Sequence, residues 1–208
     1  MTFVKICGVR DPETAYYAAT RGARFVGIIF AKESERVVDS DRAIAIAKAA
    51  KKGGAKVVGV FVEQNAETMQ RIADKVGLDV VQLHGEVARE NHGELSENLI
   101  RIYVCPVSAD GFIREENHQG FSALNKKRDF LLYDGLNPGS GKVFEWDALE
   151  PRRDFNFILG GGLNPKNVKV AIKKKQPDGV DVASGVEKPR LKKDLKLIEA
   201  FILEAECE

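Results

Sequence analysis

Short apolar runs rich in β-branched residues alternate with amphipathic stretches along the whole chain. The runs are nearly continuous in apolar residues, as expected of parallel strands that are covered on both faces. Eight of them read as strands, at residues 3–7, 24–30, 56–62, 79–83, 99–105, 129–134, 155–159 and 179–182. This alternation predicts repeated βα units and a parallel sheet.

The segments between these strands carry start and stop signals of helices. Asp11 can accept hydrogen bonds from the first amides of a helix, and Pro12 suits the first turn because it has no amide hydrogen to satisfy. Alanine and isoleucine fill residues 40–52, and two glycines follow as a helix stop. Near the C-terminus, the residues that recur at helical spacing are Leu191, Leu195, Ile198 and Ile202. The patterns at 86–96 and 146–150 are weaker, so we expect the fourth and sixth helices to be short or irregular.

Eight strands, each followed by a helix, predict an α/β fold, namely a single-domain (β/α)8 TIM barrel with short loops over residues 1–208. A doubly wound open sheet is the alternative, because the strand count alone does not prove closure. The 208 residues suit one domain with a large core and lie near the lower limit for this barrel. Most loops must therefore be short, and the informative residues are expected just after the strands.

Charge and composition exclude several classes of partner. The 32 basic and 31 acidic residues give a net charge of +1, so no overall field attracts nucleic acid or an anionic membrane. No apolar run approaches the roughly 20 residues that span a bilayer, and the first residues read as a strand rather than a signal peptide. We expect a cytoplasmic protein, and a monomer rather than a homodimer.

The cysteines and histidines give no metal or disulfide pattern. Cys7, Cys105 and Cys207 are odd in number and widely spaced, which is typical of reduced thiols. The three histidines have no metal-ligand spacing to one another or to a cysteine, so we expect no metal site.

Two glycine-rich turns follow the seventh and eighth strands, at 160–162 and 183–185. This architecture often binds phosphate at these two positions, because small residues let backbone amides approach the phosphate oxygens. Asn164 and Pro165 also resemble a helix start, which would add partial positive charge. The alternative is that the glycines only make tight turns. Gly141 and Lys142 do not form a nucleotide phosphate loop, since the first glycine of that motif is missing.

Several titratable residues follow strands and are candidates for acid–base chemistry. Cys7 could be a partly exposed base beside Gly8 or a small buried filler, and Cys105 has the same kind of placement. Asp134 ends an apolar strand, where poor solvation would raise its pKa and make it a candidate general acid, or it could cap the loop.

Other polar residues near strand ends have two possible interpretations each. Arg36 could bind an anionic substrate through its planar guanidinium or be an ordinary solvated charge. His84 could line the mouth of the barrel or satisfy its own loop. For Asp181 we favour a supporting role.

Together these residues form motifs that resemble phosphoribosylanthranilate isomerases over essentially the whole chain. The motifs are VKICG at 4–8, FVGIIF at 25–30, SER at 34–36, VVGVFV at 57–62, VQLHG at 81–85, GSGK at 139–142, GGLNP at 161–165 and GVDVASGVE at 179–187. They follow in the order of that family. The family is expected to have the predicted barrel fold.

The resemblance implies an Amadori rearrangement of N-(5′-phosphoribosyl)anthranilate in tryptophan biosynthesis, without a cofactor. Asp134 would protonate the ribose ring oxygen, and Cys7 would remove a proton from the iminium intermediate. Arg36 would hold the anthranilate carboxylate. The remaining candidate residues for binding this phosphorylated substrate are His84, Gly141, Gly161, Gly162, Asp181, Ser184 and Gly185.

Some positions depart from the family pattern. Ala183 replaces the usual serine, Gly160 replaces the commoner alanine, and the loop at 135–140 looks shortened. Other phosphate-binding barrels, such as indole-glycerol-phosphate synthase or a sugar isomerase of histidine biosynthesis, are alternatives, but they would be expected to use a lysine-centred set or two aspartates. A non-catalytic barrel that binds phosphorylated metabolites is a third possibility.

Overall fold

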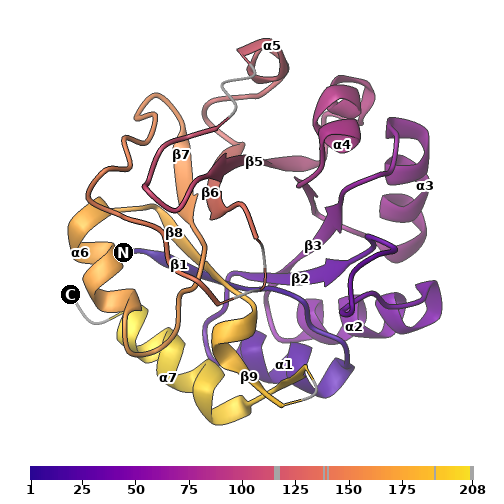
Figure 1. Cartoon of the computed structure of the whole chain (residues 1–208). Coiled ribbons are helices and arrows are strands. Elements are labelled where there is room, and N and C mark those ends of the chain that lie inside the picture. The colour runs from indigo at the N-terminus through magenta and orange to yellow at the C-terminus, as the bar shows by residue number, and fades with distance from the viewer. Residues whose placement is uncertain (115–117, 138, 140, 190, 207–208) are drawn as a thin grey trace.

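The structure is a computed structural model that describes residues 1–114, 118–137, 139, 141–189 and 191–206. All eight major strands are parallel and form a closed barrel, in which the first strand pairs with the second and the eighth (Figure 1). The strands are β1 (Phe3–Ile6), β2 (Phe25–Ile29), β3 (Lys56–Phe61), β4 (Val80–Leu83), β5 (Ile100–Val107), β6 (Phe130–Gly135), β7 (Asn156–Leu159) and β8 (Gly179–Val182). The closed barrel confirms the predicted fold class and excludes the open sheet.

Helices surround this barrel (Figure 1). They are α1 (Pro12–Thr20), α2 (Ser40–Lys52), α3 (Ala66–Val76), α4 (Glu86–Asn91), α5 (His118–Phe121), α6 (Val168–Lys175) and α7 (Leu195–Glu206), with 3-10 turns η1 (His92–Glu94) and η2 (Ser184–Val186). Asp11 caps α1 as predicted, since its side chain accepts a hydrogen bond from the Thr14 amide at 2.8 Å. In the described part of the chain, no helix is long and apolar enough to cross a membrane.

Three local predictions were wrong. The segment 146–150 forms a turn instead of a helix, because Trp146 and Leu149 are buried in the core without one. Leu191 has a positive φ of 58° and lies in a hairpin between β9 (Glu187–Lys188) and β10 (Lys192–Lys193), so the last helix starts only at Leu195. Asn164 belongs to a turn that precedes α6, since its side chain accepts a hydrogen bond from the Lys166 amide.

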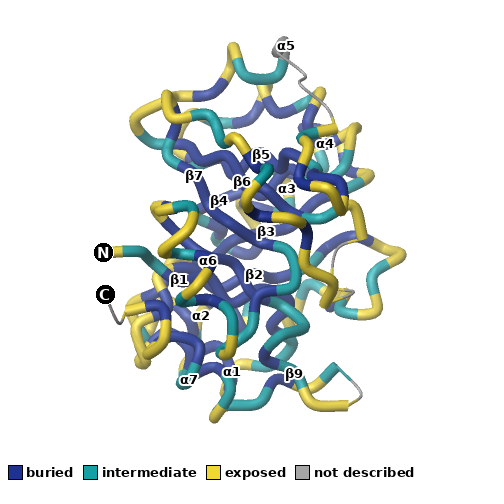
Figure 2. Tube along the Cα trace, turned by 60° about the vertical axis from the view of Figure 1, so that its left-hand side comes forward, coloured by how far each residue is buried: buried dark blue, intermediate teal, exposed yellow. Residues whose placement is uncertain are grey.

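The core has two layers of side chains, one inside the barrel and one between the strands and the helices. The strands at the centre are mostly buried, and exposed residues lie in the surrounding helices and loops (Figure 2). Inside, Phe3, Phe25 and Phe130 pack edge to face with ring centroids 5.2 to 6.0 Å apart and fill the amino-terminal end of the barrel. Side chains alternate between the two faces of a strand, so Lys5 and Cys7 point inward with Phe3. The polar residues of the barrel interior therefore lie above an apolar floor, toward the carboxyl ends of the strands.

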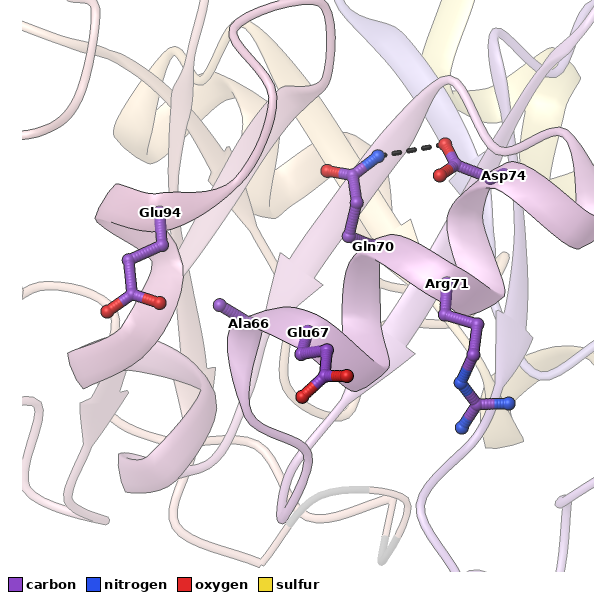
Figure 3. Close-up of a pocket in the computed structure, with 6 residues that line it drawn as sticks. All are labelled: Ala66, Glu67, Gln70, Arg71, Asp74 and Glu94. Carbon is purple, nitrogen blue, oxygen red and sulfur yellow. Dashed lines mark hydrogen bonds between the residues drawn. The ribbon is translucent and has the colours of Figure 1, made fainter.

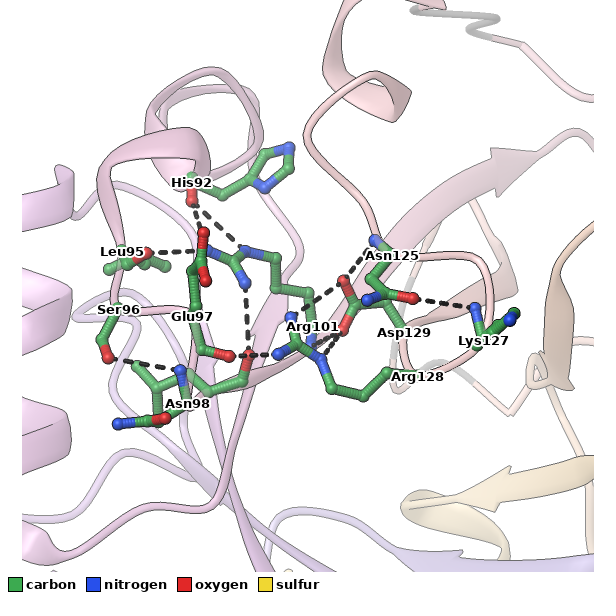
Figure 4. A network of polar contacts seen from close by, with 11 residues as sticks. His92, Leu95, Ser96, Glu97, Asn98, Arg101, Asn125, Lys127, Arg128 and Asp129 are labelled. Carbon is green, nitrogen blue, oxygen red and sulfur yellow. Dashed lines mark hydrogen bonds and ion pairs between the residues drawn. The ribbon is translucent and has the colours of Figure 1, made fainter.

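A buried polar network holds the amino-terminal side of β5 and β6 (Figure 4). The Arg101 guanidinium donates hydrogen bonds to the carbonyl oxygens of His92, Leu95 and Leu99. The fully buried Asp129 carboxylate accepts one from the Arg101 amide at 3.0 Å. This network lies at the amino-terminal end of the barrel, where residues of this fold serve its stability.

Replacing Arg101 with methionine is expected to lower the free energy of unfolding by about 2–5 kcal/mol, because three carbonyl groups lose their buried donors. Urea denaturation checks this value. Arg71→Met on the exposed side of α3 is the matched control, with an expected change within about 0.5 kcal/mol. An Arg101→Met variant as stable as the control would show that the network contributes little.

Candidate active site

The site is a cluster of charged and polar side chains inside the barrel, at the carboxyl ends of the strands. The register of β1 and β8 places Lys5 opposite Asp181. The Lys5 Nζ lies 2.8 Å from Asp181 Oδ1, and both side chains are buried. Cys7 follows on the same inward face of β1, and Asp134 projects from the end of β6 on the face that carries Phe130 and Leu132. The fold thus brings these four side chains together.

Cys7 is a buried thiol that packs on the backbone of β2. An added Cβ at Gly27 would lie only 2.9 Å from its Sγ, so a residue without a side chain is needed there. Burial raises the pKa of Cys7, whereas the positive charges of Lys5 and Lys193 act to lower it. The thiol is therefore neutral in the resting site, next to ammonium groups that favour its ionised form.

Cys105 is excluded from this cluster by its direction. It packs in the outer core layer, while Ile102 and Val104 of the same strand face the barrel interior. Burial raises the pKa of Cys105 to about 12. Two cysteines with the same placement in the sequence thus differ in the structure, and Cys207 lies outside the described residues.

Asp134 is a buried carboxyl whose Oδ1 accepts a hydrogen bond from the Gly135 amide at 2.8 Å. Burial and the negative charge of Asp181 raise the pKa of Asp134 to about 7. This is the direction that a carboxyl at the end of an apolar strand predicts. Near neutral pH a large fraction of Asp134 is protonated and able to donate a proton.

Arg36 lies at the edge of the cluster and is paired rather than free. Its Nε and Nη2 donate to the Glu187 carboxylate at 2.9 and 2.7 Å. Glu187 also accepts a hydrogen bond from Lys193 at 2.8 Å. An added Cβ at Gly8 would lie 2.8 Å from Arg36 Cδ, so the arginine lies directly beside the end of β1. The β9–β10 hairpin therefore fixes the direction of the guanidinium.

His84 is partly buried behind the end of β4. Its Nδ1 lies 3.2 Å from the Nε2 of Gln82, whose side chain points inward with Val80. Burial, with the charge of Lys5, lowers the pKa of His84 to about 4. The imidazole is therefore neutral at physiological pH and held by the Gln82 amide.

The three glycine-containing loops after β6, β7 and β8 contact one another. An added Cβ at Gly162 would lie 2.6 Å from the Lys142 backbone, and one at Gly185 would overlap the Leu163 carbonyl oxygen. Gly141 lies beside Ser184, since its added Cβ would be 3.7 Å from Ser184 Oγ. Gly141, Gly161 and Gly162 also have positive φ values, which glycine adopts without strain. The fold gathers most of the predicted phosphate-binding residues at one place.

A surface hollow of about 470 Å³ lies elsewhere, between α3 and η1 in the outer helical layer (Figure 3). It is lined by Ala66, Glu67, Gln70, Arg71, Asp74 and Glu94. Gln70 donates to Asp74 within the helix, and none of these residues belongs to the barrel cluster. Among the described residues, no group of three or more histidine, cysteine, aspartate or glutamate side chains could hold a metal ion.

The sequence interpretation missed Lys5, Glu187 and Lys193 as members of the site. A charged residue at an inward position of β1, two residues before Cys7, was a usable signal, because such a position normally holds an apolar side chain. Glu187 and Lys193 had no comparable signal, since their roles depend on the hairpin pairing.

Comparison with known proteins agrees with this geometry. The model of the N-(5′-phosphoribosyl)anthranilate (PRA) isomerase family matches residues 4–204. The N-(5′-phosphoribosyl)anthranilate isomerase of Chlamydia caviae is 41% identical over 203 residues, which cover 97% of this chain and 96% of that protein. Monomers of the dimeric phosphoribosylanthranilate isomerase from Thermotoga maritima are 33% identical, with a TM-score of 0.80 and 99% of each chain covered.

A second solved structure is a phosphoribosyl anthranilate isomerase in complex with reduced 1-(o-carboxyphenylamino)-1-deoxyribulose 5-phosphate. It is 34% identical, with a TM-score of 0.80 and 99% of each chain covered. The resemblance seen in the sequence motifs is therefore confirmed. This chain belongs to the N-(5′-phosphoribosyl)anthranilate isomerase family.

Proposed function

We propose that Cys7 and Asp134 are the base and the acid with which this chain isomerises N-(5′-phosphoribosyl)anthranilate to 1-(2-carboxyphenylamino)-1-deoxyribulose 5-phosphate in tryptophan biosynthesis. The observation that carries these roles is that Cys7 and Asp134 stand at inward-facing ends of β1 and β6, at the carboxyl end of the barrel, where the charges of the buried Lys5–Asp181 pair act on both. Catalytic residues of such barrels project from this end.

The reaction needs one proton donor and one proton acceptor. Protonated Asp134 gives its proton to the ribose ring oxygen as the C1′–O bond breaks, and the nitrogen lone pair forms the C1′=N bond of an iminium ion. Ionised Cys7 then takes the C2′ proton, the electrons of that C–H bond form the C1′=C2′ bond, and the electrons of the C1′=N double bond return to nitrogen, which gives an enolamine. Tautomerisation of the enolamine gives the 2-ketone product. The ring opening and the proton shifts that follow need only one acid and one base, for which these two side chains suffice.

The remaining residues support substrate binding. Arg36 would hold the anthranilate carboxylate with donors that Glu187 does not occupy, because a guanidinium has five N–H groups and Glu187 accepts from two nitrogens. Backbone amides of the joined loops around Gly141, Gly162 and Gly185 would bind the phosphate. Neutral His84 would contact the substrate without adding charge.

Freshly prepared N-(5′-phosphoribosyl)anthranilate tests the function directly, since its conversion changes the fluorescence of the anthranilate group. Turnover by the purified chain supports the isomerase. Binding without turnover would instead indicate a barrel that has lost its chemistry. The relative from Thermotoga maritima is described as dimeric, so the monomeric state expected for this chain stays a prediction. Its expected cytoplasmic location is also a prediction.

Replacing Arg36 with methionine is expected to raise KM about 10- to 100-fold and to lower kcat less, because a charged hydrogen bond to the substrate is lost in ground and transition states alike. Glu187 keeps Lys193 as its counter-ion in this variant. Steady-state kinetics measure both constants. Arg42→Met, on the exposed face of α2, is the control, and an equal KM in both variants would contradict the role of Arg36.

A further inference from the structure

We propose that Lys5 and Asp181 act as a positioning pair that sets opposite protonation states at Cys7 and Asp134. The Lys5 ammonium favours the Cys7 thiolate, and the Asp181 carboxylate keeps the proton on Asp134. This inference rests on the proposed function, because it explains how the acid and the base reach the states that the reaction requires.

The geometry places one charge of the pair near each reacting group. Continued by one residue, the register of β6, β7 and β8 puts Asp134 and Asp181 on either side of Gly160, where an added Cβ would lie 3.4 Å from Asp134 Oδ1 and no side chain separates the two carboxyl groups. Lys5 lies two residues before Cys7 on the same inward face of β1, and its ammonium interacts both with Asp181 and with the thiol. Its side chain has no exposed surface, and a buried ammonium persists only when it is paired. The ammonium therefore stays charged beside Cys7.

The two charges act with different weight on the two groups. Burial has the largest effect on the pKa of Cys7 and raises it. The positive charge of Lys5 has the second largest effect and lowers this pKa, and the negative charge of Asp181 raises it by less. Burial also has the largest effect on the pKa of Asp134 and raises it. The negative charge of Asp181 has the second largest effect and raises this pKa further, whereas the positive charge of Lys5 has a smaller effect and lowers it. Each member of the pair thus acts mainly on a different partner.

Other charged groups face the cluster and belong to the same balance. Lys193 of the hairpin and Arg36 of the loop after β2 add positive charge near Cys7. Glu187 pairs with both of them and reduces their effect. His84 is neutral, and the Gly135 amide acts on Asp134 to lower its pKa. Lys5 and Asp181 remain the charges that both reacting groups share.

The active state is then a minority form, with protonated Asp134 and ionised Cys7. Because the pKa of Asp134 is about 7 and that of Cys7 is raised above 9.0, kcat/KM should rise up to about pH 7, stay level, and fall in the alkaline range. This profile has a lower limit, where the rise ends, and an alkaline limit, where the fall begins. Removal of the Lys5 charge moves both limits to higher pH. Removal of the Asp181 charge moves both limits to lower pH.

The pH profiles of two variants test the proposal. Asp181→Asn is expected to move the lower limit of the kcat/KM profile to lower pH by about one unit and the alkaline limit by less, whereas Lys5→Met is expected to move the alkaline limit to higher pH by about one unit and the lower limit by less. If the pair serves only packing, the two substitutions should leave both limits unchanged, or should shift them in the same direction in both variants. The ultraviolet absorbance of the Cys7 thiolate, taken as the difference from Cys7→Ser, should shift with the alkaline limit.

Controls keep the test independent of folding. Lys5→Met leaves the Asp181 charge buried alone, so the double variant Lys5→Met/Asp181→Asn removes both charges and should return both limits toward those of the parent. If Lys5→Met does not fold, Asp181→Asn and the double variant decide the question. Lys51→Met breaks an exposed Lys–Asp pair and should leave the profile unchanged.

The failure of this inference and that of the proposed function are distinguishable. If the parent chain shows no turnover, both the proposed function and the proposed role of the Lys5–Asp181 pair are wrong. An active parent whose limits stay unchanged in Asp181→Asn overturns the pair alone.

Discussion

Replacing Cys7 with serine is expected to lower kcat about 10²- to 10⁴-fold with little change in KM. The serine hydroxyl has nearly the size of the thiol and fits beside Gly27, so the site should keep its shape. Its proton is held far more strongly, and the Lys5 ammonium cannot ionise it near neutral pH. The base of the proposed reaction is therefore lost, while the groups that bind the substrate remain. Fluorescence kinetics with freshly prepared substrate measure the effect.

Cys105→Ala is the matched control for this result. Cys105 is also a buried cysteine, but it lies within β5 and packs in the outer core layer away from Asp134. Its loss should cost some stability through a small cavity and leave kcat nearly unchanged. Equal loss of activity in the Cys7 and Cys105 variants would contradict the role of Cys7.

The barrel could be predicted because each strand is covered on both faces and so reads as a continuous apolar run. Strand ends were less certain. The expected fifth strand ended at Cys105, whereas β5 continues through Pro106, whose carbonyl accepts a hydrogen bond from Arg114, to Val107. The segment at 146–150 has apolar residues at helical spacing, but a turn buries Trp146 and Leu149 just as well. Local patterns do not distinguish these cases, because tertiary packing decides them.

The site was predictable where a residue ends or follows an apolar strand and so lies at the carboxyl end of the barrel, as for Cys7 and Asp134, whose catalytic roles stay proposals. It was not predictable where a role arises from contacts between distant segments. The sequence leaves Arg36 as either an anion-binding or a solvated side chain, and only the fold brings Glu187 to it across 151 positions of the chain. The choice between Cys7 and Cys105 likewise depends on which face of its strand each occupies.

Replacing Asp134 with asparagine is expected to lower kcat about 10²- to 10⁴-fold and to change the shape of the pH profile. Asparagine has the size of aspartate but has no acidic proton to give to the ring oxygen. In the parent, the rise of kcat/KM with pH is expected to stop near pH 7, because burial and the charge of Asp181 raise the pKa of Asp134 to about 7. In the variant this limit disappears, so the residual activity should keep rising with pH until Cys7 is ionised. A profile that still levels off near pH 7 would assign that limit to another group.

The free energy of unfolding, measured as a function of pH, shows whether Asp134→Asn loses activity because the acid is missing or because the protein unfolds. The pKa of Asp134 is raised from 3.8 to about 7, so between these values the folded state holds a proton that the unfolded state has released. The stability that Asp134 contributes is therefore complete below pH 3.8 and is lost as the pH rises through about 7. Asparagine lacks this loss, so the variant should gain stability relative to the parent from pH 4 to pH 8. An Asp134→Asn protein that is inactive and yet more stable than the parent at pH 8 would show that burial of this carboxyl serves catalysis at a cost in stability.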